Sequence, residues 1–167
     1  LNSGSYAGAI ANSGTLNYAS STSQTLSGVI SGTGSVTKSG SSTLTLSGNN
    51  TYSGDTTISA GTINVSGRIG NGSYSGAIAN SGTLIMSSST AHTLSGAISG
   101  SGGITKSGSG NLTLSGSNNF TGTITLSNGT LIGASDNALG SAPTIAASNS
   151  PTFQTSSSSI TLPSLTV

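Results

Sequence analysis

The sequence contains no cysteine and no tryptophan, and only 3% of its 167 residues are charged. Without cysteine, neither a disulfide bond nor a thiol can contribute to the structure or to chemistry. Three basic residues are too few for phosphate-driven binding, so we expect no nucleic-acid partner. No window of the chain holds 18 consecutive apolar residues, and we therefore expect no membrane span in it.

Apolar residues are also scarce, at 31% of the chain, whereas an ordinary globular domain has roughly 45–50%. Ser, Thr and Gly make up most of the remaining sequence, with 39, 25 and 26 residues, together 90 of 167. Such a composition is typical of disordered linkers. However, the net charge is only +1, and the apolar residues recur at regular positions. These two observations favour a folded chain with a thin core.

An internal repeat organises the chain. Residues 26–40 read LSGVISGTGSVTKSG and residues 94–108 read LSGAISGSGGITKSG, an offset of 68 residues. Residues 6–65 align with 74–133 without a gap, and 37 of the 60 positions are identical. We therefore predict one β-solenoid segment over 1–167, with repeats at 6–73 and 74–141 and further degenerate rungs over 142–167. We expect it to be a fragment of a longer chain or a stacking unit.

Short strands separated by turns are predicted inside each repeat. Residues 43–46 read TLTL and residues 111–114 read NLTL, the alternation of a half-buried strand. Gly, Asn and Ser cluster between such segments, and no helical apolar stripe persists. A β-sandwich also has short strands, but its strands rarely repeat without gaps. We predict an all-β parallel β-helix, a β-solenoid with three strands per rung.

The expected size of the coil follows from this division. Three strands and three turns need roughly 20–25 residues, a spacing typical of solenoid rungs. On this interpretation a 68-residue repeat holds three rungs, and the chain holds about seven or eight. Leu44 and Leu112, which are 68 residues apart, should then stack in one ladder.

The segment 34–63 resembles the passenger-associated transport repeat of bacterial autotransporters, as found in antigen-43-like adhesins. Its features are a Thr-Lys-x-Gly turn, Leu-Thr-Leu-Ser-Gly, an aromatic residue before x-Gly, and Thr-Ile-x-x-Gly-Thr; they recur over 102–131 with Phe120 as the aromatic. Residues 134–140 resemble the segment that often follows this repeat. The resemblance implies a single-stranded right-handed β-helix that is secreted to the outer surface of a Gram-negative bacterium. It also implies roles in adhesion, aggregation or biofilm matrix, with sugars on Ser and Thr in some relatives, which this composition permits.

The ionisable residues do not suggest a reaction centre. The two carboxylates, Asp55 and Asp136, lie 81 residues apart, so nothing pairs them as a general acid and base. His92 is the only histidine, so no second histidine is available for a metal site. We predict no catalytic, cofactor-binding or metal-binding residue, and no enzyme activity.

Four residues are weak candidates for surface contacts with a partner. Lys38 and Lys106 are the charged residues kept between the repeats, and a solubilising charge at a turn is the favoured interpretation for them. Tyr6 and Tyr74 keep their hydroxyl group in both repeats and could stack on sugars. The expected partners are the chain itself, through end-to-end stacking or lateral aggregation, and host or matrix glycans.

The leading functional hypothesis is an extracellular structural or adhesive β-helix of the bacterial surface. One alternative is a subunit or segment of an extracellular solenoid filament that assembles end to end. Another is an ice-binding solenoid, prompted by the Thr-x-Thr sequences at 43–45 and 123–125. We disfavour this third hypothesis at the level of sequence, because the Thr-x-Thr spacing along the chain is irregular.

Overall fold

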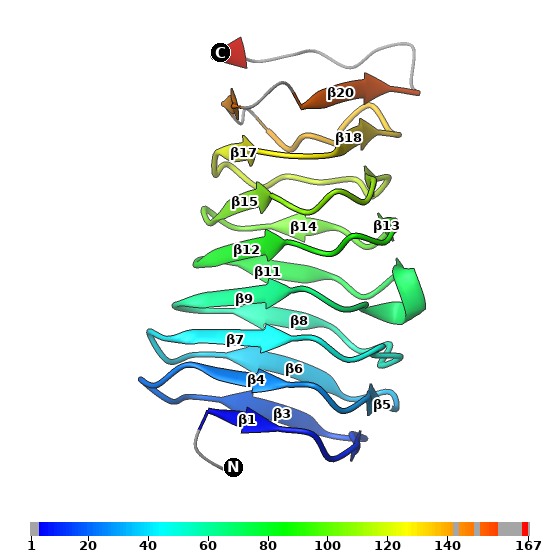
Figure 1. Cartoon of the computed structure of the whole chain (residues 1–167). Coiled ribbons are helices and arrows are strands. Elements are labelled where there is room, and N and C mark those ends of the chain that lie inside the picture. The colour runs from blue at the N-terminus through cyan, green and yellow to red at the C-terminus, as the bar shows by residue number, and fades with distance from the viewer. Residues whose placement is uncertain (1–3, 142–143, 149–150, 157–164, 167) are drawn as a thin grey trace.

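A computed structural model describes residues 4–141, 144–148, 151–156 and 165–166 of the chain. They form a β-solenoid in which parallel strands from successive coils stack along one axis (Figure 1). In the described part, the helical element is a single 3-10 turn, η1 (Gly70–Gly72). The predicted all-β solenoid is confirmed.

The longest sheet, which we call the front sheet, has nine strands and faces the viewer in Figure 1. Its strands are β1 (Ser5–Tyr6), β4 (Gln24–Leu26), β7 (Thr43–Leu46), β9 (Thr62–Val65), β12 (Thr83–Met86), β15 (Gly103–Lys106), β17 (Ile124–Leu126), β19 (Ile145–Ala147) and β21 (Leu165–Thr166). All of its pairings are parallel, and the eight strands from β1 to β19 define seven turns.

Two further faces complete each rung. The back sheet contains β3 (Thr15–Tyr18), β6 (Ser35–Lys38), β8 (Thr56–Ile58), β11 (Ile78–Asn80) and β14 (Ile98–Ser99). The side face lies between front and back along the chain and is formed by the pair β2 (Ile10–Ala11) and β5 (Ile30–Ser31), followed by β10 (Ser73–Tyr74), β13 (His92–Leu94), β16 (Leu112–Leu114), β18 (Thr130–Gly133) and β20 (Thr152–Thr155). Among the described residues, four rungs have the predicted three strands, as in β12, β13 and β14, whereas the rung of β7 has strands only on the front and back and the rung of β15 only on the front and side.

A rung is shorter than a third of the sequence repeat. Paired residues in the front sheet are 19 to 21 positions apart, for example Thr25 with Thr45 and Thr45 with Asn64. A shift of 68 residues therefore covers three rungs and part of a fourth. Leu44 lies in β7 of the front sheet, whereas Leu112 lies in β16 of the side face. The expectation that these two leucines share a ladder was wrong, because the rung is nearer 20 residues than 23.

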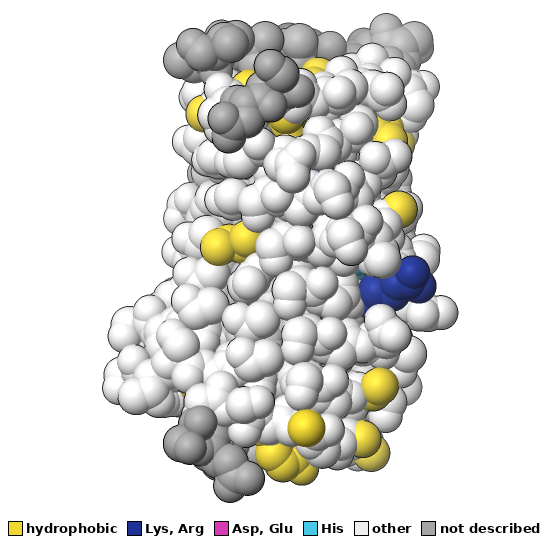
Figure 2. Space-filling model, in the orientation of Figure 1, with side chains coloured by type: hydrophobic (Ala, Val, Ile, Leu, Met, Phe, Trp, Pro, Cys, Tyr) yellow, Lys and Arg dark blue, Asp and Glu magenta, His cyan; other side chains and the backbone are white. Residues whose placement is uncertain are grey.

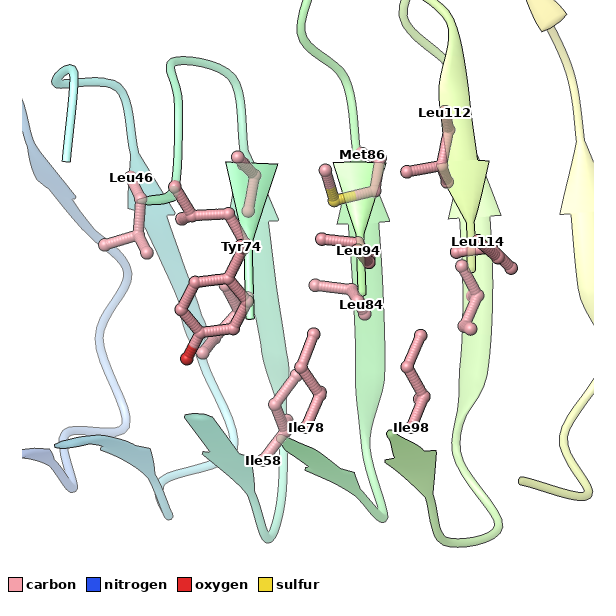
Figure 3. Close-up of a cluster of buried hydrophobic side chains, with 14 of the residues drawn as sticks. Leu46, Ile58, Tyr74, Ile78, Leu84, Met86, Leu94, Ile98, Leu112 and Leu114 are labelled. Atoms are coloured by element: carbon pink, nitrogen blue, oxygen red, sulfur yellow. The ribbon is translucent and has the colours of Figure 1, made fainter. Parts of the chain in front are cut away.

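The core is a narrow column of inward-facing side chains. In β7 the burial alternates, with Leu44 and Leu46 fully buried and the threonines between them partly exposed. Figure 3 shows Leu84, Leu94 and Ile98 from three faces of the coil converging in the interior. Because each rung buries only a few aliphatic groups, lengthwise backbone hydrogen bonding must supply much of the order.

Candidate functional surface

Lys38 and Lys106 are buried, not exposed. Each ends a strand in an inward-facing position, and its side chain is 0% and 2% exposed, respectively. The Lys38 Nζ donates to the Gly40 carbonyl, and the Lys106 Nζ donates to Gly108 and, at 3.1 Å, to Asn128. Burial lowers the pKa of both ammonium groups. The predicted surface contact is therefore wrong for both lysines.

In the Thr-Lys-x-Gly sequence the lysine side chain stabilises the turn that follows it. Lys38 pairs in register with Tyr18 and Ile58, so its aliphatic stem occupies the same inward row as these side chains. The ammonium lies 5.4 Å from the centre of the Tyr18 ring and closes the turn at Gly40. The repeated lysine is thus explained by the structure without any partner.

Tyr74 is also buried, with 1% exposure, and its predicted role as a surface contact is wrong. Its hydroxyl belongs to a chain of polar groups inside the coil. The Thr56 hydroxyl lies 2.8 Å from the Tyr74 hydroxyl and 3.0 Å from that of Tyr52, and Tyr74 also donates to the Gly54 carbonyl. Burial raises the pKa of both tyrosines. Tyr6, the equivalent of Tyr74 in the first repeat, is half-buried and packs against the core, and its contact role stays a prediction.

His92 occupies the inward row of β13. Its Nδ1 lies 3.1 Å from the Thr90 carbonyl, and its Nε2 has no hydrogen-bond partner. Burial lowers the pKa of this imidazole, and the charges of Arg68 and Lys106 add to the effect. Its repeat equivalent, Gln24, is buried in the same way with an unpaired Nε2.

Nothing in the described residues gathers these groups into a reaction centre. Asp55 is exposed on the back of the coil, where its Oδ1 accepts a hydrogen bond from the Ala77 amide at 2.8 Å. No cluster of three or more His, Cys, Asp or Glu side chains suited to a metal ion occurs among residues 4–141 and the shorter described segments beyond them.

Sequence reasoning missed the buried asparagines. Asn50 accepts a hydrogen bond from the Ile30 amide at 2.9 Å, and Asn118, its repeat equivalent, accepts one from the Ile98 amide at 2.7 Å. Their amide groups donate to carbonyls of neighbouring rungs, at Arg68 and Ala138. The signal was available, because an asparagine stands at both positions whereas the polar residues on either side of it change, Asn49 to Ser117 and Thr51 to Asn119.

Since the reactive side chains lie inside or apart, the candidate functional site is the outer surface. We define the front face as the outward positions of the front sheet in the seven rungs from β4 to β19, three positions in each rung. Seventeen of these 21 positions are Ser or Thr, and the others are Asn64, Ile85, Gly103 and Ala146. In Figure 2 most of this side of the molecule is neither charged nor hydrophobic, and Lys or Arg atoms appear only at one edge.

Comparison with known proteins identifies the repeats. Residues 36–65, from β6 to β9, and residues 104–132, from β15 to β18, match the family model of the passenger-associated-transport-repeat. No curated protein matches the chain, and no solved structure matches it. The resemblance to autotransporter passenger repeats is thus confirmed. The repeats and the β-solenoid fit an autotransporter passenger domain, and repeats of this kind imply an extracellular surface. In the part of the chain that the structure describes, no helix is long and apolar enough to cross a membrane.

Proposed function

We propose that this chain is a rigid, non-catalytic segment of a protein secreted to the outer surface of a Gram-negative bacterium, where it serves adhesion, aggregation or the biofilm matrix. The two passenger-associated-transport-repeats support the location, and the continuous parallel ladders support the rigidity. A stacked solenoid behaves as a quasi-one-dimensional rod because each rung contacts its neighbours above and below.

One observation carries this proposal. The two lysines, the histidine and Tyr74 are buried inside the coil. Hydroxyl groups, in contrast, dominate the outside of the front sheet in every rung. A single exposed hydroxyl contributes little, since each hydrogen bond replaces one to water. A rod that presents the same weak group many times gains by multivalency, because each contact after the first is intramolecular. The partners that suit such a surface are neutral glycans or a second copy of the chain.

The absence of cysteine permits a direct test, because one introduced thiol gives a single attachment point. The exposed Ser59 on the back of the coil can be changed to cysteine, and the folded chain coupled through it to beads at several densities. We expect beads to attach to glycan-coated surfaces and to one another with a dependence on density steeper than linear. The matched control is an inert protein of similar mass coupled in the same way. Attachment no greater than that of the control, or attachment only proportional to density, would contradict the proposal.

A further inference from the structure

The front face has more order than its composition alone requires. Its first column contains Thr43, Thr62 and Thr83 directly paired across three rungs, and its second contains Thr25 paired with Thr45. The third column holds a serine in all seven rungs, because each residue after β4, β7, β9, β12, β15, β17 and β19 is a serine. Thr-x-Thr itself occurs in two of the seven rungs, at β7 and at Thr123 and Thr125 beside β17, so the irregular spacing noted in the sequence holds for that pair; what recurs in every rung is a hydroxyl group in register.

These columns form a two-dimensional lattice. Neighbouring rungs lie about 4.8 Å apart, and alternate residues of one strand lie about 6.6 Å apart. Threonine suits such a lattice because its branched side chain has restricted rotamers, so its hydroxyl and methyl groups stay in place. The water oxygens in the surface planes of hexagonal ice repeat at similar distances. Nine threonines of the face present hydroxyl and methyl groups held in this way, and its eight serines add further hydroxyl groups.

The front face is electrically neutral, as the surface of ice is. No described residue at its 21 positions is charged. Where a strand of the back sheet has its repeat equivalent in the front sheet, the exposed charge is lost: Asp55, beside β8, corresponds to Thr123, beside β17. A charged group would hold its own hydration shell and disturb an ordered water layer, whereas a neutral face is complementary to an uncharged lattice.

The front face is too small for a stable, high-affinity interface with one protein partner, so a second copy of the chain would make only weak, repeated contacts there. Seven rungs and three columns cover roughly 29 Å by 13 Å, about 400 Å², which is about half of what each partner buries in a standard protein–protein interface. The 21 positions include no aromatic residue and no arginine, the residues that usually dominate binding energy there. A rigid, neutral and repetitive ligand needs neither feature, because its many sites engage together.

From these observations we infer that the front face binds ice. Threonine and serine hydroxyls take the place of water molecules in the outermost ice layer, and the threonine methyl groups lie in the gaps between them. Rigidity is essential, since a flexible surface would lose conformational entropy when it matched a lattice. This inference goes beyond the proposed adhesive function by naming a solid that one face of the rod recognises.

The test measures thermal hysteresis of the folded chain and its incorporation into a growing ice hemisphere. We expect a measurable freezing-point gap and enrichment of the chain in ice. The double variant Thr45→Tyr with Thr105→Tyr should lose both, because the two bulky rings prevent flat contact. The matched control, Thr37→Tyr with Thr57→Tyr, places the same rings at outward positions of the back sheet and should keep both. Tyrosine favours strands, so neither pair should unfold the coil, and circular dichroism verifies this.

Three outcomes would overturn the inference: no hysteresis and no ice enrichment for the unmodified chain, equal losses in both double variants, or binding to crystalline cellulose without any effect on ice. The last would assign the face to a polysaccharide lattice. The test is independent of the bead experiment, since adhesion to glycans or between beads can fail while ice activity persists, and the reverse.

Discussion

The two sequence repeats fill the interior of the coil in different ways. In the first repeat, Tyr52 and Thr56 share a hydrogen bond inside the coil. In the second repeat the equivalent residues are Phe120 and Ile124, which are both fully buried and carry no hydroxyl group. A lone buried hydroxyl costs the free energy of its desolvation, whereas removing both partners avoids that cost. The two copies thus teach that polar groups in this narrow interior change in pairs.

The largest effect is expected where the equivalent asparagines are replaced. Asn118→Leu leaves the buried Ile98 amide and the Ala138 carbonyl without the partners that the structure gives them, and should lower the free energy of unfolding by about 3–5 kcal/mol. Asn50→Leu loses three hydrogen bonds, but the Gly48 and Arg68 carbonyls keep backbone donors, so that only the Ile30 amide is left unpaired.

We therefore expect Asn50→Leu to lower the free energy of unfolding by a smaller amount than Asn118→Leu does, with a difference of at least about 1 kcal/mol. Urea denaturation followed by circular dichroism measures both values. The reverse order would mean that the number of bonds lost matters more than the number of groups left unpaired.

A smaller effect sharpens the contrast between the polar and apolar interiors. Thr56→Val removes the hydroxyl that the Tyr52 and Tyr74 hydroxyls share and should cost about 2 kcal/mol. In a Tyr52→Phe background the same substitution should cost about 1 kcal/mol less, because no tyrosine is then stranded at position 52. A double-mutant cycle in urea measures this coupling, and strictly additive costs would show that the two hydroxyls do not act as a pair.

The smallest effect concerns His92 and its equivalent, Gln24. Burial holds the pKa of His92 below its usual value of 6.5, so the unfolded chain takes up a proton first as the pH falls. Stability should consequently be complete above pH 6.5 and decrease below it, as the pH moves toward the lowered pKa of the folded state. His92→Gln, which places the residue of the first repeat at this position, should make the melting temperature nearly independent of pH between about pH 7.5 and pH 5. An unchanged slope in this variant would assign the pH dependence to another group.

Much of the fold could be predicted from the sequence, because the alternation in residues 43–46 and the gap-free repeat both report on strand geometry. The rung length could not be deduced from the repeat length, since the repeat advances to a different face: β7 lies in the front sheet and its equivalent β16 in the side face. A repeat constrains which residues recur but not how many coils separate them.

The site residues were harder to predict for a physical reason. A lysine in a turn-rich polar sequence is normally exposed, but the stem of Lys38 continues an inward-facing row while its ammonium donates to the Gly40 carbonyl at the turn. The extent of the front face could not be predicted from the two Thr-x-Thr sequences, because its threonines and serines are scattered along the chain and meet only after stacking. Neither arrangement leaves a local pattern, since both depend on the register between rungs.

The mismatch between repeat and rung has a consequence for any longer array of the same unit. Each shift of 68 residues transfers a strand from front to side, as for β7 and β16, from side to back, as for β5 and β14, and from back to front, as for β8 and β17. Equivalent strands of successive copies would therefore lie on successive faces of the coil, and those of the fourth copy would return to the face of the first. A rod built in this way would expose each surface motif of its repeat on all three faces in turn. It could therefore bind a partner from any side without first turning about its long axis.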